Sequence, residues 1–350
     1  MSNSMVQINL ESVTSVIALE EILARPYPED VAYAKKIEGS ILVLGAGGKM
    51  GPSLVARIVR AREAAGKQYH VHAVSRFSDN AQREYLEKIG ANTITTDLLD
   101  ESSLETLPDC PNVIYMAGTK FGASDNQDFT WAMNAYVPGR VADRFRNSRI
   151  VAFSTGNVYP FVSPETGGCR EVDPVGPVGE YAQSCLGRER VLQYFSRNHS
   201  IPVCILRLNY AVELRYGVLC DIATRILNSQ PVNLSMGWVN LIWQGDANSV
   251  CFRSLEHCQT PADILNLTGP EVLSVRSLAE RLGDKLGVAP QFEGEEGDSA
   301  LLNNAARCHE RFGIPRVSLE TMLAGVAAWI KSGGVMLGKP TKFEVRNGQF

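Results

Sequence analysis

From Ser40 onward, short apolar runs alternate with longer amphipathic stretches. Runs that are nearly continuous in Val, Ile and Leu are typical of strands buried on both faces, whereas apolar residues three or four apart indicate helices. The predicted strands are residues 41–44, 71–74, 93–95, 113–117, 150–154 and 203–208. The predicted helices between them are residues 50–65, 80–89, 131–146 and 181–198. Because strands joined through helices pair in parallel, we expect an α/β fold with a doubly wound parallel sheet.

The pattern divides the chain into three parts. They are 1–38, an N-terminal extension with helical patterns at 13–23 and 28–36; 39–209, the alternating domain, with a returning strand near 263–269; and 210–350, mainly a smaller C-terminal lobe. We expect the extension to pack outside the sheet or in a dimer contact. In the C-terminal part, helices are predicted at 218–228, 274–286 and 319–331.

Composition narrows the possible functions of these 350 residues. The net charge is only −4, and lysine and arginine are scattered rather than gathered in blocks, so we expect no nucleic-acid partner. No apolar run approaches the roughly 18 residues of a membrane span. The first residues lack the basic region and unbroken apolar stretch of a signal peptide, so we expect none. The eight cysteines form no C-x-x-C pair and no metal-ligand spacing with histidine. We therefore expect reduced thiols, no metal site, no membrane partner and a cytoplasmic protein.

Glycines mark the end of the first predicted strand and the start of the next helix. Residues 45–51 read Gly-Ala-Gly-Gly-Lys-Met-Gly. Glycines adopt the backbone angles that such a tight turn requires, and they let the helix and the strand pack closely. The N-terminus of the helix offers amide donors to phosphates. Between a strand and a helix, the motif predicts the pyrophosphate-binding turn of a Rossmann domain and hence a nicotinamide dinucleotide. The expected contacts are Gly45, Gly47, Gly48, Lys49, Met50 and Gly51.

The second predicted strand is followed by Ser75 and Arg76. NAD-binding domains usually have an acidic residue at this point for the ribose hydroxyls, whereas a guanidinium suits a 2′-phosphate. We therefore expect Ser75 and Arg76 at the cofactor and favour NADP over NAD. The alternative is that Arg76 is a solvated surface residue.

These features resemble the extended short-chain dehydrogenase/reductase family, which contains the NAD-dependent epimerases and dehydratases. The resemblance covers about residues 40–330 and rests on the spacing of Gly45, Gly48 and Gly51 and on the segments after later strands. It implies a Rossmann-type fold with a smaller C-terminal substrate-binding lobe, and a homodimer. It also implies further residues at the cofactor: Asp97, Leu98, Ala117, Gly118, Lys120 and the structural Asn134.

Two segments are similar to the catalytic motifs of that family. Thr155 follows the fifth predicted strand, and Tyr181-Ala-Gln-Ser-Cys185 stands where the family has Y-x-x-x-K. The resemblance implies that Thr155 hydrogen-bonds the substrate oxygen and that Tyr181 is the acid/base. Cys185 replaces the lysine whose charge lowers the pKa of the tyrosine, and a neutral thiol does not supply that charge.

Three interpretations of this departure stay open. The site uses Tyr181 with a cation borrowed from Arg188 or Lys120. It runs chemistry that needs no strongly basic tyrosinate, such as an elimination or a hydride step on an easily oxidised substrate. Or it binds the cofactor without turnover. Cys185 itself is interpreted as a small buried thiol rather than a nucleophile.

The substrate end departs from the sugar-nucleotide enzymes of the family, which carry an arginine for the substrate diphosphate. No arginine stands between residues 231 and 251, and a diphosphate usually needs such a cation. We therefore expect a small carbohydrate-like substrate: a sugar, sugar acid or lactone. Asn157, Asn209 and Gln244 are the side chains expected to contact it.

The sequence therefore predicts an NAD(P)-dependent, epimerase/dehydratase-like oxidoreductase that transfers hydride with Tyr181 and Thr155 at the substrate. The alternative is a catalytically decayed sensor or scaffold that still binds the dinucleotide. The missing lysine supports this alternative, whereas the retained Thr155, Tyr181 and Asn134 oppose it.

Overall fold

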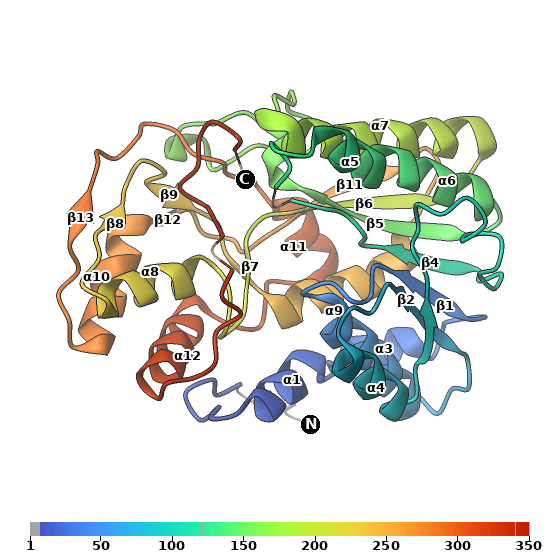
Figure 1. Ribbon diagram of the computed structural model, residues 1–350, viewed down its shortest axis with the longest axis horizontal. Helices are drawn as coiled ribbons and strands as arrows, with labels where there is room; N and C mark the ends of the chain where they lie inside the picture. The colour runs from blue at the N-terminus through green and yellow to red at the C-terminus, as the bar shows by residue number, and fades with distance from the viewer. Residues whose placement is uncertain (1–7, 121, 340, 350) are drawn as a thin grey trace.

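A seven-stranded sheet forms the centre of the computed structural model, which describes residues 8–120, 122–339 and 341–349 (Figure 1). The strands are β1 (Ile41–Leu44), β2 (Val71–Ser75), β3 (Asn92–Thr95), β4 (Asn112–Tyr115), β5 (Arg149–Thr155), β6 (Val203–Leu208) and β11 (Asp263–Leu267). Their order is β11-β6-β5-β4-β1-β2-β3, and every neighbouring pair is parallel. The predicted Rossmann-type, doubly wound sheet is therefore confirmed.

Helices cover both faces of this sheet. Ile41 and Val43 pack into one buried cluster and Leu42 and Leu44 into another, because successive side chains of a strand point to opposite faces. The first cluster includes α3 (Gly51–Ala64), α4 (Asn80–Lys88) and α9 (Gln244–Arg253); the second includes α6 (Val137–Arg144) and α7 (Gly179–His199). Burial on both faces accounts for the nearly continuous apolar runs of the strands.

The helix predicted over residues 131–146 is three joined elements. They are α5 (Gln127–Trp131), a π-helical turn η1 (Ala132–Tyr136) and α6. Pro138 has no amide hydrogen, so the carbonyl of Asn134 lacks its regular helical donor. Arg188 of α7 donates from Nε to that carbonyl at 3.1 Å instead. The π-helical turn thus ties η1 to the neighbouring helix.

Two helices do not show in the hydrophobic pattern: α9 and α11 (Ala306–Phe312). Most of α9 is buried, including its polar residues Asp246, Asn248 and Ser249, because the helix packs against α3 and the N-terminal helices. A helix that is buried on nearly all sides has no amphipathic period in its sequence.

A second group of helices lies beside the sheet. α8 (Val218–Leu227), α10 (Val275–Leu286) and α12 (Leu319–Lys331) pack on one another around a shared apolar core. Their bounds agree with the predicted ranges to within one residue. Three short strand pairs surround them: β7 (Ala211–Val212) with β10 (Ile242–Trp243), β9 (Trp238–Val239) with β12 (Leu273–Ser274), and β8 (Val232–Asn233) with β13 (Phe292–Glu293).

The N-terminal residues connect these two groups of elements. Leu10, Val13, Leu19 and Leu23 are buried in the apolar core of α8, α10 and α12. At the same time α1 (Val16–Ala24) packs along α3, and α2 (Pro28–Ala34) packs on α3 and α9. Both helices pack outside the sheet, one of the two placements expected for the extension.

A buried ion pair fastens α2 to α3. Asp30 Oδ2 is 2.7 Å from Arg57 Nη1, and both side chains are 0% exposed. Asp30 also accepts hydrogen bonds from the amide of Tyr27 at 2.8 Å and from Ser249 Oγ at 2.6 Å. Desolvated charges need such partners, so each member of the pair depends on the other.

Asp30→Ala leaves the guanidinium of Arg57 buried without its carboxylate. We expect the free energy of unfolding, measured by urea denaturation, to fall by about 3–5 kcal/mol. Glu29→Ala is the matched control, because Glu29 pairs with Arg316 at the surface, where an ion pair contributes about 0–1 kcal/mol. Equal losses in the two variants would contradict this ranking.

Candidate active site

The backbone of the glycine-rich turn fits a phosphate group. Gly45 has a φ of +91°, and a Cβ there would lie 2.5 Å from the amide nitrogen of Ala117. A Cβ on Gly51 would lie 2.2 Å from the carbonyl oxygen of Ala46, so only glycine lets α3 begin this close to β1. Gly48 is exposed at the tip, and the first turn of α3 has no acidic residue. The positive end of the α3 dipole is therefore open to a pyrophosphate.

The residues predicted for the outer end of the cofactor lie beside this turn, where β2 and β3 end. Ser75 faces Gly47 so closely that a Cβ on the glycine would lie 2.4 Å from Ser75 Oγ. The side chain of Arg76 is 68% exposed, with Nη1 3.8 Å from Oδ2 of Asp97. Leu98 is buried in the apolar cluster that includes α6. Arg76 is thus held only loosely by its acidic neighbour.

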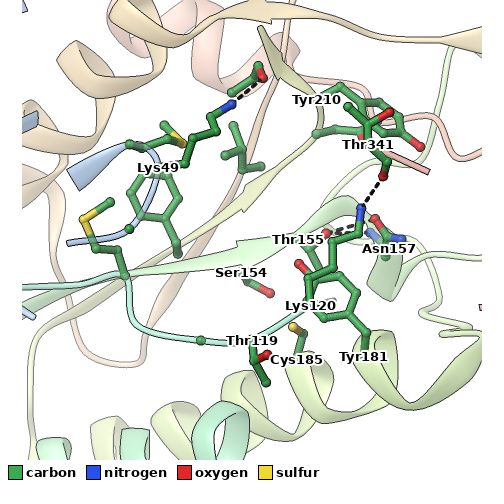
Figure 2. Close-up of a pocket in the computed structure, with 18 of the residues that line it drawn as sticks. Lys49, Thr119, Lys120, Ser154, Thr155, Asn157, Tyr181, Cys185, Tyr210 and Thr341 are labelled. Carbon is green, nitrogen blue, oxygen red and sulfur yellow. Dashed lines mark hydrogen bonds between the residues drawn. The ribbon is translucent and has the colours of Figure 1, made fainter. Parts of the chain in front are cut away.

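A cleft with a volume of about 330 Å³ opens beyond the turn (Figure 2). It brings together predicted residues that are far apart in the sequence: Gly48, Lys49, Met50, Ala117, Gly118, Lys120, Asn134, Thr155, Asn157, Tyr181, Cys185 and Asn209. The predicted residues outside its lining are Gly45, Gly47, Gly51, Ser75, Arg76, Asp97, Leu98 and Gln244. Residues 48–50 of the glycine turn and the predicted catalytic residues therefore line one cavity.

Asn134 joins the loop after β4 to α7. Its Oδ1 accepts from the amide of Thr119 and from Nη2 of Arg188, both at 3.0 Å. Its Nδ2 donates to the carbonyl of Thr119 at 2.9 Å and to Ser184 Oγ at 3.0 Å. The side-chain amide thus has protein partners on every side, and it fixes the backbone immediately before Lys120. These contacts fit the structural role that the family resemblance implies for Asn134.

Tyr181, Thr155, Cys185 and Lys120 lie together at the end of the cleft nearest α7 (Figure 2). Lys120 Nζ is 5.8 Å from the centroid of the Tyr181 ring. Burial raises the pKa of Tyr181, and the Cys185 thiol raises it further, while a hydrogen bond with Thr155 and the charge of Arg188 lower it. Burial also raises the pKa of the Cys185 thiol. Both Tyr181 and Cys185 therefore keep their protons at neutral pH.

Two lysines enter the cleft from opposite sides (Figure 2). Lys120 Nζ donates to the carbonyl of Thr341 at 3.1 Å. Lys49 Nζ donates to the carbonyl of Ala211 at 3.1 Å and lies 3.9 Å from the centroid of the Tyr216 ring. Burial lowers the pKa of each lysine to about 8. Both ammonium groups are thus poorly hydrated yet mostly charged at neutral pH.

Arg188, the other cation considered for the tyrosine, is engaged by other groups. Its Nη1 donates to the carbonyl of Phe153 at 2.7 Å, and its other nitrogens donate to Asn134. The guanidinium lies 5.4 Å from the centroid of the Tyr115 ring. Arg188 therefore holds β5 and η1 against α7, while Lys120 is the cation beside the ring of Tyr181.

A buried ion pair that the sequence analysis did not predict binds Ser154, the neighbour of Thr155 in β5. Glu189 of α7 and Arg207 of β6 are 2.7 Å apart and almost completely buried. Ser154 Oγ donates to Glu189 Oε1 at 2.6 Å, and Arg207 Nη1 donates to Tyr159 Oη at 2.6 Å. The sequence signal is an arginine inside the otherwise apolar run of β6, which demands an internal counter-charge.

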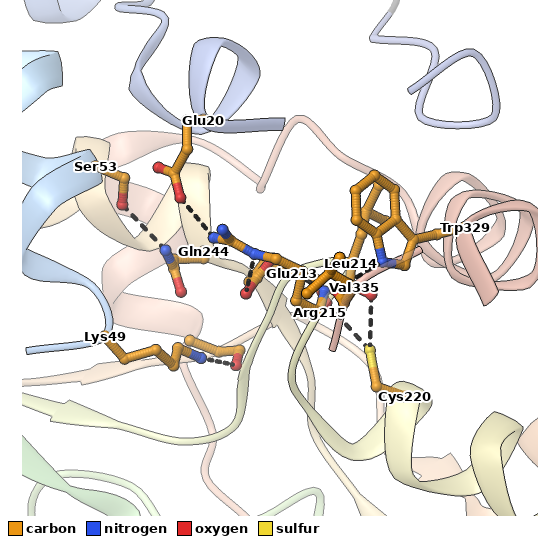
Figure 3. A network of polar contacts seen from close by, with 11 residues as sticks. Glu20, Lys49, Ser53, Glu213, Leu214, Arg215, Cys220, Gln244, Trp329 and Val335 are labelled. Atoms are coloured by element: carbon orange, nitrogen blue, oxygen red, sulfur yellow. Dashed lines mark hydrogen bonds and ion pairs between the residues drawn. The ribbon is translucent and has the colours of Figure 1, made fainter. Parts of the chain in front are cut away.

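Two of the three predicted substrate contacts lie in the cleft, and the third lies outside it. Asn157 and Asn209 line the cleft: Asn157 Oδ1 accepts from Thr155 Oγ1 at 3.0 Å, and Asn209 Nδ2 donates to the carbonyl of Leu301 at 3.2 Å. Gln244 does not line it. As the first residue of α9, it turns into the interface with α3, where its Nε2 donates to Ser53 Oγ at 3.0 Å (Figure 3). The contact predicted for Gln244 is corrected accordingly.

The cleft residues that were not predicted from the sequence include Tyr210, Tyr216 and Thr341. Tyr210 has a φ of +44°, unusual for a residue with a side chain, and follows Asn209 directly. Thr341 comes from the segment after the last helix, where no motif or period marks a functional residue.

The part of the chain that the structure describes offers neither a metal cluster nor a membrane-spanning helix. No cluster of three or more His, Cys, Asp or Glu side chains in it is arranged to hold a metal ion. Nor is any helix of these residues long and apolar enough to cross a membrane.

Solved structures with sequence identities below 20% share this fold. The UDP-glucuronic acid 4-epimerase of Bacillus cereus in complex with NAD is 19% identical at a TM-score of 0.71, covering 83% of this chain and 98% of that one. The UDP-glucose 4-epimerase of Thermotoga maritima with UDP-glucose is 18% identical at a TM-score of 0.68, covering 84% and 99%. A dTDP-glucose 4,6-dehydratase of Streptomyces venezuelae with NAD bound is 18% identical at a TM-score of 0.71, covering 83% and 97%.

A comparison with curated proteins found no significant match. A family model described as the NAD dependent epimerase/dehydratase family matches residues 41–236, which is more than half of the 350 residues. The matched segment contains the glycine turn, Thr155 and Tyr181. The predicted resemblance is confirmed: the chain belongs to the NAD-dependent epimerase/dehydratase family.

Proposed function

We propose that the protein is an NAD(P)-dependent oxidoreductase of the epimerase/dehydratase type that acts on a small carbohydrate-like substrate. The observation that supports this best is the convergence of Tyr181, Thr155 and Lys120 in the cleft that opens from the glycine turn. A nicotinamide dinucleotide, when bound, supplies the hydride donor or acceptor. The chain itself supplies positioning and proton transfer.

In this proposal Tyr181 moves a proton at a substrate oxygen, and Thr155 hydrogen-bonds the same oxygen. Because burial keeps the phenol protonated, Tyr181 begins as a proton donor. To act as a base it needs a stabilised phenolate, and the charge of Arg188 and the ammonium of Lys120 beside its ring both favour the charged form. We therefore favour the interpretation in which the site borrows its cation from Lys120.

The cleft favours a small substrate that carries negative charge. Its volume of about 330 Å³ is at the lower end of the roughly 300–1,000 Å³ of ligand sites, and the nicotinamide must share it. Lys49, Lys120 and Arg188 line the cleft, and its described lining contains no aspartate or glutamate. Of the three substrate types considered (a sugar, a sugar acid or a lactone), a sugar acid therefore fits best.

Tyr181→Phe removes the transferable proton and keeps the ring. We expect kcat to fall at least about 100-fold, with cofactor affinity unchanged. Turnover is measured on hexuronic acids and the matching neutral hexoses, from nicotinamide absorbance and from NMR spectra of the sugar. Tyr194→Phe, at an exposed position of the same helix, is the control. A Tyr181→Phe enzyme as active as the control would refute the assignment.

For the cofactor, we infer a preference for NADP from Arg76. The guanidinium is exposed, lies beside the glycine turn and is only loosely paired with Asp97. A 2′-phosphate offers it shorter, charge-assisted hydrogen bonds in place of that pair.

Arg76→Ala is expected to weaken NADPH binding about tenfold, since hydrogen bonds to charged groups contribute about 1.5–3 kcal/mol. Binding of NADH is expected to stay unchanged, and both affinities are measured by calorimetry. Arg83→Ala, an exposed arginine on α4, controls for the loss of positive charge. If NADPH and NADH weaken equally, Arg76 does not contact a 2′-phosphate.

The second candidate function, a decayed dinucleotide sensor, rests on Cys185 in place of a lysine. In a decayed site, restoring the lysine should raise activity. Here Cys185 is buried, and the cleft beside it already holds Lys120 and Arg188, whose like charges would oppose a third cation.

We therefore expect Cys185→Lys to lower both turnover and the melting temperature. Gln183→Lys adds the same charge at an exposed position of α7 and is expected to change neither. Turnover on the sugar panel and thermal unfolding are the measurements. A gain of activity in Cys185→Lys would favour the decayed site.

A further inference from the structure

After its last helix, the chain passes along the cleft. Beyond α12 it continues without helix or strand, between the sheet and the C-terminal helices, in dark red in Figure 1. The amide of Leu337 donates to the carbonyl of Arg215 at 3.2 Å, and Thr341 then lines the cleft. We call the residues from Thr341 to Gly348 the C-terminal strap.

Both ends of the strap are anchored to the C-terminal lobe. Asp221 Oδ2 of α8 accepts from the amide of Thr341 at 2.8 Å and from its hydroxyl at 2.6 Å. Phe343 is buried in the core of α8, α10 and α12. Near the other end, Arg346 donates from Nη1 to the carbonyl of Ser299 at 2.6 Å and from Nη2 to its hydroxyl at 2.9 Å. These contacts hold a chain segment that has no secondary structure of its own.

The strap also reaches the elements that carry the catalytic residues. Gly348 packs on Gly179 so closely that a Cβ on Gly179 would lie 2.5 Å from the carbonyl oxygen of Gly348. Gly179 is the first residue of α7, two positions before Tyr181. At the opposite edge, the carbonyl of Thr341 accepts the hydrogen bond from Lys120 Nζ (Figure 2).

Several charged and titratable groups around Lys120 affect the pKa of its ammonium. The charged and titratable groups that face the ammonium are Cys185 and Tyr181 of α7, Asp221 of α8, Lys342 and Glu344 of the strap, and Lys49 of the glycine turn. Of these groups, Cys185, Asp221 and Glu344 raise the pKa of Lys120 and Lys342 lowers it, while burial lowers it most. Burial lowers the pKa of Lys120 to about 8, and the Thr341 carbonyl of the strap is among the groups that contact its ammonium.

We propose that the C-terminal strap is part of the active site, with Thr341 as a positioning residue that holds Lys120 beside Tyr181 and with Asp221 as the anchor of Thr341. The strap also closes the cleft on the side of the C-terminal lobe, which limits the substrate to a small molecule. The proposal rests on the proposed function for the role of Tyr181, but the placement of Lys120 can be tested without turnover.

The test is the pH dependence of lysine acetylation by acetic anhydride, followed at each site by mass spectrometry. In the intact chain we expect midpoints near pH 8 for both Lys120 and Lys49. A chain ending at Gly334, and Phe343→Ala in the full chain, both expose Lys120 to water. Phe343→Ala removes the buried side chain that holds the strap and changes no charge near the lysine. The midpoint of Lys120 should then rise toward the roughly 10.4 of a hydrated lysine. Lys49, held by Ala211 and Tyr216, should keep its midpoint.

Ile314→Ala, which shortens an exposed apolar side chain, is the matched control and should leave both midpoints unchanged. The proposal is overturned if the Lys120 midpoint stays near pH 8 in Phe343→Ala, or if it is already near 10.4 in the intact chain. It is also overturned if both lysines shift together, because the strap then only keeps the cleft closed in general. Where the shortened chain does not fold, Phe343→Ala decides alone. If the lysine midpoints contradict the strap proposal while Tyr181→Phe is inactive, the proposed function still holds.

Discussion

The side-chain amide of Asn134 is the contact on which the cleft depends. It binds the loop after β4 through both backbone groups of Thr119 and binds α7 through Ser184 and Arg188. The π-helical turn that carries it frees its own carbonyl for Arg188. This contact helps to set the distance between the loop that holds Lys120 and the helix that holds Tyr181. The irregular turn of one helix is thereby the connection between the two segments.

The charge that the cleft presents depends on which of the nearby ionic groups are paired inside the protein. Ion pairs such as Glu189 with Arg207 and Asp30 with Arg57 are satisfied inside the protein and leave no charge for a ligand. The two lysines also contact groups without a net charge, namely carbonyl oxygens and aromatic rings. Such groups hold an ammonium without neutralising it. A bound anion therefore meets a positive field in a poorly hydrated space, where charge attraction is stronger than in water.

The sheet and the glycine turn were predictable from the sequence because each rests on a local pattern. Apolar runs identify strands covered on both faces, and glycines mark backbone that must pass close to Ala117 and Ala46. The positions of α9 and Gln244 were not predictable, since a helix buried on nearly all sides has no period and its polar residues find partners in other elements. Thr341 was not predictable from the sequence for another reason. Its place in the cleft results from tertiary contacts of a segment with no motif.

The N-terminal extension has a mechanical consequence. Leu19 and Leu23 belong to the core of the C-terminal helices, while Asp30, a few residues later, is locked to α3 beneath the sheet. The first helices thus join the core of the C-terminal helices to α3. If these two groups of elements slid past one another, either Leu19 and Leu23 would leave their core or Asp30 would separate from Arg57. Because residues from both groups line the cleft, the extension helps to keep the two sides of the cleft aligned, although it contributes no residue to the described lining.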